Sequence, residues 1–374
     1  MIEAVELDAL GAIAGYERLI ASCDRAGVPR FKIGETLFGT PIFAYDTDGG
    51  PLEQGRTPIL VTAGAHAEEA AGVLTALRLL HDPGVPLRLV VVPCRDPLGW
   101  DGVRRTFARA VGREVPMKSH TQAVEAFARF GEILWDDDGF TVARVGELAF
   151  CSFAPEHPGN EDTGEFVQAY LRERPERAHM LRGMRLLVPG SPALAEGRDV
   201  YDWGGGPTVY VDHTGRVGNM NRFFASERPP VEVSAIRSLV DRIQPAYLFD
   251  LHENFGDKFG MYTNAADPDK ARRVYVAMID AVVAAGYPLM PLKELLPYLG
   301  LAPGVLLELY PGVYSPNREL RRPPDGLGSS IAARGIASFT TEMGLGRPLA
   351  YRAGATEVAV RAGLEAIAAM ERGG

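Results

Sequence analysis

Short runs of consecutive apolar residues recur along the chain, and amphipathic segments lie between them. A run of four to eight apolar residues without polar alternation is typical of a strand buried on both faces, as in a parallel sheet. We therefore predict strands at residues 59–63, 87–92, 246–251 and 336–344. Apolar residues spaced three or four positions apart predict helices at residues 70–80, 230–243 and 270–285 and near the C-terminus.

The order of these segments predicts the fold class. Strand, helix and strand follow one another between residues 59 and 92, which is the spacing of a βαβ unit. We expect an α/β protein with a mixed, mainly parallel central sheet and helices on both faces. The 374 residues are interpreted as a single domain, 1–374. In residues 106–218, helical patterns alternate with Gly- and Pro-rich stretches. This indicates a large insertion, for which a lid is one interpretation.

Two of the predicted strands lead into residues of the types that bind metals. His66 and Glu69 follow the first strand at the start of a helix, and His252 ends a later strand. Parallel strands place such ends at one edge of the sheet, where open α/β sheets bind their ligands. Two histidines and one glutamate suit Zn²⁺ and leave a fourth position open for water, as in catalytic sites. The sequence therefore predicts one Zn²⁺ per chain, bound by His66, Glu69 and His252.

Two further carboxylates have predicted roles near this ion. Glu342 ends the strand 336–344, so it reaches the same edge if that strand is also parallel. It is the candidate general base that takes a proton from water and passes it to the leaving amine. Asp250 lies two residues before His252, on the same face of the strand, and is expected to orient the imidazole ring.

Other titratable residues are expected to lie outside the ligand set. Glu68 is interpreted as a solvated residue at a helix start, and Glu253 as a residue that supports the site or lies on the surface. The run Asp136–Asp138 is interpreted as a solvated acidic turn, because no ligand spacing for a cation surrounds it.

The order of these motifs resembles that of the zinc carboxypeptidases and of their deacylase relatives, the succinylglutamate desuccinylase and aspartoacylase branch. The matching stretches are Phe31–Ile42, His66 with Glu69, Asn221-Arg222, Asp250-Leu251-His252 and Phe339-Thr340-Thr341-Glu342. They cover both ends and the centre of the chain and leave residues 106–218 unmatched. The resemblance implies a zinc carboxypeptidase-like fold.

The resemblance also implies roles for residues outside the metal site. Asn221 and Arg222 match the family's pair that holds the substrate carboxylate, and a guanidinium group is suited to bidentate carboxylate binding. Arg105, or alternatively Arg104, would polarise the scissile carbonyl and hold the oxyanion. The chain has Asp96-Pro97 where family members usually have Asn-Pro, so the choice between the two arginines stays open.

The predicted function is that of a zinc metallohydrolase that cleaves an amide or peptide bond next to a carboxylate, as a carboxypeptidase does. One alternative is an N-acyl amino acid deacylase of the succinylglutamate desuccinylase/aspartoacylase type. Another is a non-catalytic, zinc-dependent protein that binds peptide ends. The expected substrate is a peptide or an N-acyl amino acid that carries a carboxylate.

Composition narrows the partners and the compartment. The formal net charge of −9 disfavours nucleic acid and anionic membranes. The chain has no apolar stretch of about 18 residues, and the N-terminal segment is acidic where a secretory signal is basic. Its three cysteines are widely separated, which argues against a disulfide framework. We therefore expect a cytoplasmic protein without nucleic-acid or membrane partners.

Overall fold

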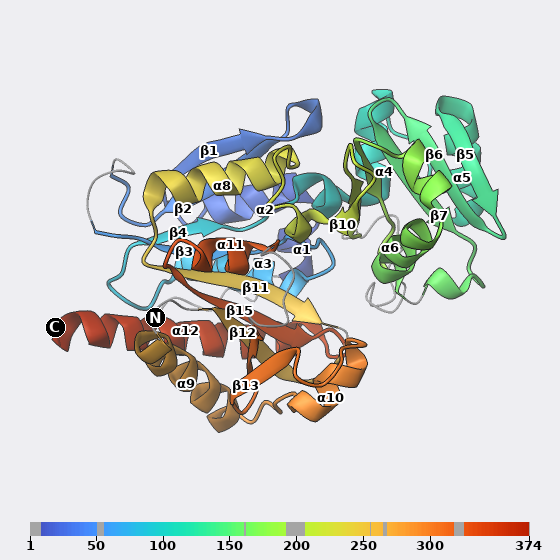
Figure 1. The fold of residues 1–374 in the computed structure, drawn as a ribbon. Helices are drawn as coiled ribbons and strands as arrows, with labels where there is room; N and C mark the ends of the chain where they lie inside the picture. The colour runs from blue at the N-terminus through green and yellow to red at the C-terminus, as the bar shows by residue number, and fades with distance from the viewer. Residues whose placement is uncertain are drawn as a thin grey trace.

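The described part of the chain forms two sheets of unequal size (Figure 1). The computed structural model of this protein describes residues 9–50, 56–160, 162–191, 206–254, 256–264, 268–317 and 325–373, so the acidic N-terminal segment lies outside the described residues. The larger sheet has nine strands, in the spatial order β1 (Arg30–Glu35), β2 (Pro41–Asp46), β4 (Leu89–Val92), β3 (Ile59–Thr62), β11 (Tyr247–Asn254), β15 (Ala337–Gly344), β12 (Phe259–Asn264), β14 (Val313–Pro316) and β13 (Leu306–Tyr310).

The centre of the larger sheet is parallel, and its flanks are antiparallel except for the parallel pair β12–β14. Strands β4, β3, β11 and β15 run parallel side by side, and α3 (Ala70–His81) connects β3 to β4 in the expected βαβ unit. The pairs β1–β2, β2–β4, β12–β15 and β13–β14 are antiparallel. The sheet is therefore mixed, and the expectation of a mainly parallel sheet is wrong. Short connections, such as residues 36–40 between β1 and β2, allow hairpins but no crossover to a parallel neighbour.

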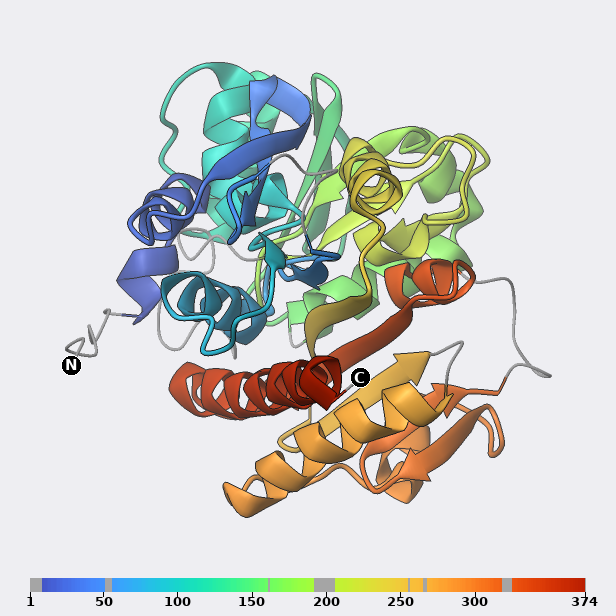
Figure 2. The same ribbon diagram turned by 90° about the vertical axis from the view of Figure 1, so that its left-hand side faces the viewer.

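Helices cover both faces of the larger sheet, as expected (Figures 1 and 2). One face carries α1 (Ala9–Ile13), α2 (Tyr16–Asp24), α3, α9 (Pro268–Ala284) and α12 (Leu349–Gly373). Figure 2 shows α12 and α9 side by side along this face. The opposite face is covered by α8 (Val231–Ile243) and α11 (Leu327–Ala332). Among the described helices, none combines the length and the apolar character needed to cross a membrane.

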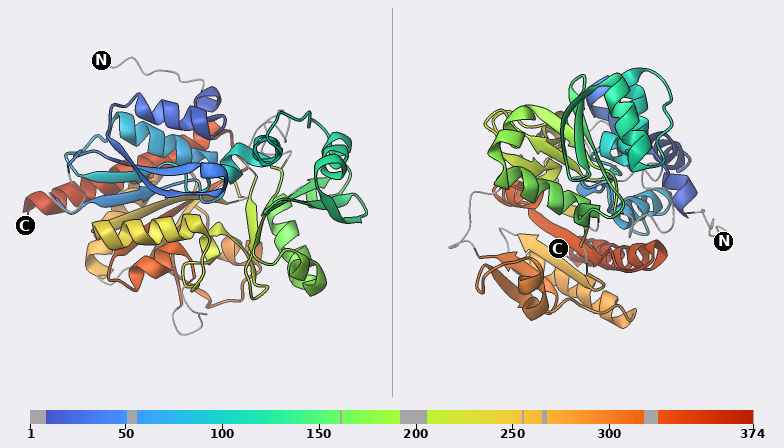
Figure 3. Two further views of the ribbon diagram at one scale, coloured as in Figure 1. Left: turned by 90° about the horizontal axis from the view of Figure 1, so that it is seen from above. Right: turned by 90° about the vertical axis from the view of Figure 1, so that its right-hand side faces the viewer.

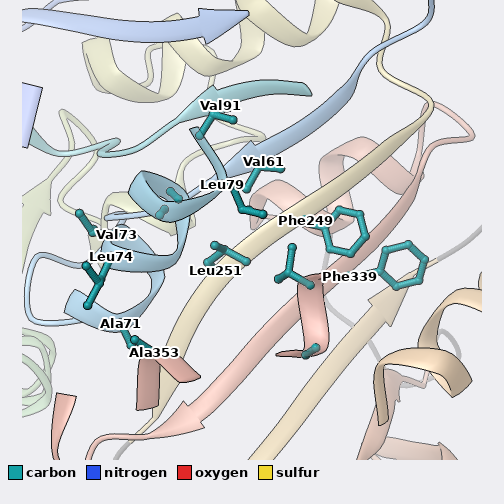
Figure 4. Close-up of a cluster of buried hydrophobic side chains, with 14 of the residues drawn as sticks. Val61, Ala71, Val73, Leu74, Leu79, Val91, Phe249, Leu251, Phe339 and Ala353 are labelled. Atoms are coloured by element: carbon teal, nitrogen blue, oxygen red, sulfur yellow. The ribbon is translucent and has the colours of Figure 1, made fainter. Parts of the chain in front are cut away.

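Alternate residues of the central strands point to opposite faces of the sheet. Val61, Phe249 and Phe339 pack among side chains of α3 and α12 (Figure 4). Leu60 and Leu248, each one position away, pack instead beneath α8 and α11. All five side chains are buried, which explains why the strands appear in the sequence as uninterrupted apolar runs. The same alternation decides which face each polar residue at a strand end will occupy.

The second sheet lies to one side of the larger one (Figure 3). It is formed within and directly after the segment 106–218, and it has its own buried clusters of aromatic and aliphatic side chains. The role of this segment as a lid stays a prediction. Its strands, in spatial order, are β10 (Val217–Asn219), β9 (Thr208–Val211), β8 (Met184–Leu187), β7 (Leu148–Phe153), β6 (Phe140–Val145) and β5 (Glu132–Asp137). The remaining helices are α4 (Pro97–Val111), α5 (His120–Phe130), α6 (Thr163–Glu173), α7 (Pro175–Met180) and α10 (Leu292–Tyr298), with short 3₁₀ turns η1 (Leu37–Gly39), η2 (Pro158–Asn160) and η3 (Met220–Arg222).

Candidate metal centre

His66 and Glu69 lie in the turn that joins β3 to α3. The chain leaves β3 through Gly64, which has a φ of 61°. A Cβ atom at this position would come within 3.0 Å of the Cys94 Cα, so the turn requires glycine in both respects. The turn brings His66 Nδ1 to 2.7 Å from Glu69 Oε1. The pair predicted from its spacing therefore has its ligand atoms facing each other.

Strand β11 brings His252 to the same carboxylate. It runs parallel to β3 with Asp250 opposite Thr62, so His252 extends two residues beyond the end of that pairing. His252 Nδ1 lies 2.8 Å from Glu69 Oε2. One ligand atom from each of His66, Glu69 and His252 lies within 4.8 Å of the other two. The three side chains thus form one compact group with the donor types that Zn²⁺ binds at about 2.0–2.2 Å.

The electrostatics of this group suit a cation. Burial raises the pKa of Glu69, but His66 and His252 outweigh burial and bring that pKa down to about 2. Burial lowers the pKa of His252, but Asp250 and Glu69 outweigh it and raise that pKa to about 10. The carboxylates therefore hold a proton on His252 when no metal is bound. Metal binding to such a site exchanges that proton for the ion.

Asp250 supports the ring of His252, as predicted from their spacing. Asp250 Oδ2 lies 3.1 Å from His252 Nε2, on the side of the ring away from Glu69. Thr62 Oγ1 donates to Asp250 Oδ1 at 2.7 Å and holds the carboxylate in place. A carboxylate at Nε2 leaves Nδ1 as the free ligand atom of the imidazole.

The two neighbouring glutamates lie outside the ligand set. Glu253 points to the opposite face of β11, where it is buried and accepts hydrogen bonds from the Ala71 backbone and from Arg352. Glu68 is half-buried rather than solvated, which corrects the expectation for this residue. Its Oε1 lies close to α6: the distance to a Cβ atom placed at Gly164 would be 3.9 Å. Burial, Glu69 and the acidic start of α6 raise the pKa of Glu68 well above its ordinary value.

Glu342 lies beside His252 on the neighbouring strand. The two residues are register partners in the parallel pair β11–β15, so their side chains point to the same face of the sheet. Burial raises the pKa of Glu342 well above its ordinary value, Glu69 raises it further, and His252 and Arg222 oppose the rise. The structure therefore brings the predicted general base next to the ligand set. A carboxyl group with a raised pKa is suited to proton transfer near neutral pH.

Asn221 and Arg222 reach the centre through η3, with opposite orientations. Asn221 is buried, its Oδ1 accepts a hydrogen bond from the Leu327 backbone, and its Nδ2 lies 3.3 Å from His252 Nε2. Arg222 is exposed, and its charge acts on Glu342. The role of the pair in substrate binding stays a prediction. Of the two side chains, the buried Asn221 faces His252, and the charged Arg222 faces solvent.

Arg105 lies on the side of α4 that faces the N-terminal helices. A Cβ atom at Gly15 would come within 2.2 Å of Arg105 Nη1, and its charge acts on Asp101. Among the described residues, no hydrogen bond or ion pair connects Arg105 to the ligand set. Its predicted catalytic role stays a prediction without support from these contacts.

Arg95 contacts the ligand set, and sequence reasoning did not single it out. Its Nη2 lies 3.2 Å from His252 Nε2 and 3.2 Å from Asp250 Oδ1. A usable signal was present, because Arg95 follows β4 three residues after its end, at the same edge of the sheet as His66.

Comparisons with known proteins find similar solved structures but no similar sequence family. No family model and no curated protein matches the sequence. Similar solved structures include a metallo-carboxypeptidase from Burkholderia cenocepacia, with 13% identity and a TM-score of 0.47 over 94% of this chain and 70% of that chain. A candidate metallopeptidase from Shewanella denitrificans has 13% identity and a TM-score of 0.46 over 95% and 88% of the two chains. Bovine thrombin-activatable fibrinolysis inhibitor, in complex with tick carboxypeptidase inhibitor, has 12% identity and a TM-score of 0.42 over 94% of each chain. The chain is thus similar to metallopeptidases and carboxypeptidases of known structure.

Proposed function

We propose that this protein is a zinc-dependent hydrolase that cleaves an amide or peptide bond next to a carboxylate, as a carboxypeptidase does. The observation that carries the proposal is the convergence of His66, Glu69 and His252, with their ligand atoms within 4.8 Å of one another. Glu342, the register partner of His252, adds a carboxyl group at the same place. Three ligands with a separate acid–base group are the parts of a catalytic zinc site.

The residues have distinct roles in this proposal. His66 and His252, through Nδ1, and the Glu69 carboxylate would hold the ion. When bound, Zn²⁺ would polarise the scissile carbonyl and make water more acidic. Glu342 takes a proton from the attacking water and returns it to the leaving amine.

Substrate orientation is assigned to Arg222. It is the exposed guanidinium group beside Glu342, and it can bind a carboxylate with two parallel hydrogen bonds. Asn221 is buried behind His252, so its contribution is to hold the segment from which Arg222 projects. A substrate carboxylate bound at Arg222 would place the neighbouring amide bond close to Glu342.

The first test is the metal content of purified wild-type protein and of the variants His66→Ala and His252→Ala. We expect about one zinc per chain in the wild type and its loss in both variants, because each removes one of three ligands. His157→Ala is the matched control, because His157 lies near the second sheet among aromatic side chains. Metal content that is the same in all four proteins would refute the proposal.

A substrate panel then separates the two hydrolase activities. Peptides with a free C-terminal carboxylate, the same peptides with an amidated C-terminus, and N-acyl amino acids would be incubated with the zinc-loaded protein. Cleavage of the free peptides alone supports a carboxypeptidase, and cleavage of the N-acyl amino acids alone supports the deacylase alternative. Peptide binding without cleavage of any substrate would favour the non-catalytic alternative.

A further inference from the structure

A buried arginine at a predicted cation site is unexpected, because its charge by itself opposes metal binding. The Arg95 side chain is only 5% exposed. Its Nη1 and Nη2 both lie 3.4 Å from Asn221 Oδ1, and Nη2 also contacts Asp250 and His252. These contacts all lie on the Nε2 side of the His252 ring, away from the ligand atom Nδ1. Arg95 therefore touches the groups that support a ligand and does not occupy the metal position.

The backbone of Arg95 is tied to the other ligand-bearing segment. Its N–H donates to the Ala63 carbonyl at 2.9 Å, and the next N–H, that of Asp96, donates to the Gly64 carbonyl at 2.9 Å. Ala63 and Gly64 begin the turn that carries His66 and Glu69. One residue thus joins the turn after β3, through its backbone, to the end of β11 and to η3, through its side chain.

We propose that Arg95 is a positioning residue of the metal centre. It holds Asp250 and Asn221 in place, so that His252 presents Nδ1 toward Glu69, and it connects the ligand set to the Asn221–Arg222 segment. This inference rests on the proposed zinc-dependent function. Two physical effects of Arg95 oppose each other here: repulsion predicts tighter zinc binding when Arg95 is removed, whereas loss of positioning predicts weaker binding.

The test is the zinc dissociation constant, measured by competition with a chromophoric chelator. We expect Arg95→Met to weaken zinc binding about 10- to 100-fold, the range typical for groups that support a metal ligand. Arg95→Lys should restore part of the affinity, because an ammonium group can pair with Asp250 but cannot reach Asn221 at the same time. Arg88→Met and Arg88→Lys are matched controls: Arg88 directly precedes β4 at its other end, is equally buried, and pairs with Asp46. The Arg88 variants should keep wild-type zinc affinity.

A double variant tests the route of the effect. If Arg95 acts through Asp250, then Arg95→Met should change the zinc dissociation constant much less in an Asp250→Asn background than in the wild type. A dissociation constant for zinc that is unchanged or lower in Arg95→Met would overturn the inference while leaving the proposed function intact. The same fold-change in both backgrounds would also overturn it. A wild-type protein that binds no zinc would overturn both.

Discussion

Each of the two sheets carries histidine and carboxylate side chains, but among the described residues only those of the larger sheet come together as a ligand set. In the larger sheet, His66, Glu69 and His252 come from the ends of parallel neighbours and lie within 4.8 Å of one another. In the second sheet, Asp136–Asp138 and His157 line an open cavity of about 660 Å³. Asp137 there already pairs with Arg177, at 3.0 Å, and accepts a hydrogen bond from Tyr170.

The difference between the two sites follows from strand direction. Parallel neighbours end at the same edge, so residues far apart in sequence meet there. Asp136–Asp138 instead lie where β5 turns directly into β6; Asp136 and Asp138 are exposed as expected for a solvated acidic turn, whereas Asp137 is half-buried. A hairpin turn gathers residues that are adjacent in sequence and leaves them in solvent. The comparison teaches that convergence of buried strand ends, and not local charge density, marks the candidate site.

The largest expected effect is on turnover, and it comes from Glu342, the carboxyl group that lies beside the ligand set. Glu342→Gln should lower turnover about 10²- to 10⁴-fold, because general acid–base catalysis contributes this much, while zinc stays bound. Activity and metal content would be measured on the same preparation. Asp138→Asn, an exposed carboxylate at the edge of the second sheet, is the control and should leave both values unchanged. Wild-type activity in Glu342→Gln would remove this residue from the mechanism.

The second prediction concerns the ion pairs that join the two sheets. Arg185 on β8 is buried and pairs with Asp96, which precedes α4, and with Glu232 on α8. Arg185→Met should lower the free energy of unfolding by about 3–5 kcal/mol, because it leaves two buried carboxylates without their cation. Urea denaturation would measure the change. Glu232→Gln in the same background should recover part of the loss.

An exposed pair provides the control for that measurement. Arg144 and Glu132 form an ion pair on the outer strands of the second sheet, with side chains 47% and 59% exposed. Arg144→Met should change the free energy of unfolding by about 1 kcal/mol or less. Equal losses for Arg185→Met and Arg144→Met would contradict the view that the buried pairs fasten the second sheet to the first.

The third prediction concerns the exposed guanidinium beside Glu342. Arg222→Met should raise KM and lower kcat/KM about 10- to 100-fold for substrates with a free carboxylate, since hydrogen bonds to charged groups contribute about 1.5–3 kcal/mol. For substrates with an amidated end, kcat/KM is expected to be the same in Arg222→Met as in the wild type, provided that their cleavage is measurable. An equal loss for both kinds of substrate would show that Arg222 has a structural role instead.

The smallest expected effect is a pH dependence of the second sheet. His120 Nδ1 lies 2.9 Å from Ser152 Oγ, and burial lowers the pKa of His120 below its ordinary value. Below that ordinary value, about 6.5, the unfolded chain binds the proton more readily than the folded chain. The free energy of unfolding should therefore fall as pH falls through this range, and His120→Asn should flatten that dependence. Denaturation of both proteins at pH 7.5 and pH 5.5 tests the sign; a steeper fall in the variant would contradict it.

Much of the site could be predicted because its information is local. The strands were recognised because both of their faces are apolar, as Leu60 and Val61 show by packing on opposite faces. The i, i+3 spacing of His66 and Glu69 in a turn between strand and helix was enough to pair them. The two-residue spacing of Asp250 and His252 was likewise enough to place both on one face of β11.

What only the tertiary structure decided depends on contacts between segments far apart in the chain. The antiparallel pairs at the flanks of the sheet, the burial of Asn221 behind His252, and the position of Arg95 rather than Arg105 at the ligand set all belong to this class. Local spacing places a residue on a strand, a helix or a turn. Which distant strand, helix or turn then lies beside it is decided by the packing of the whole chain, because the free energy of burying apolar faces is shared among all elements of the core.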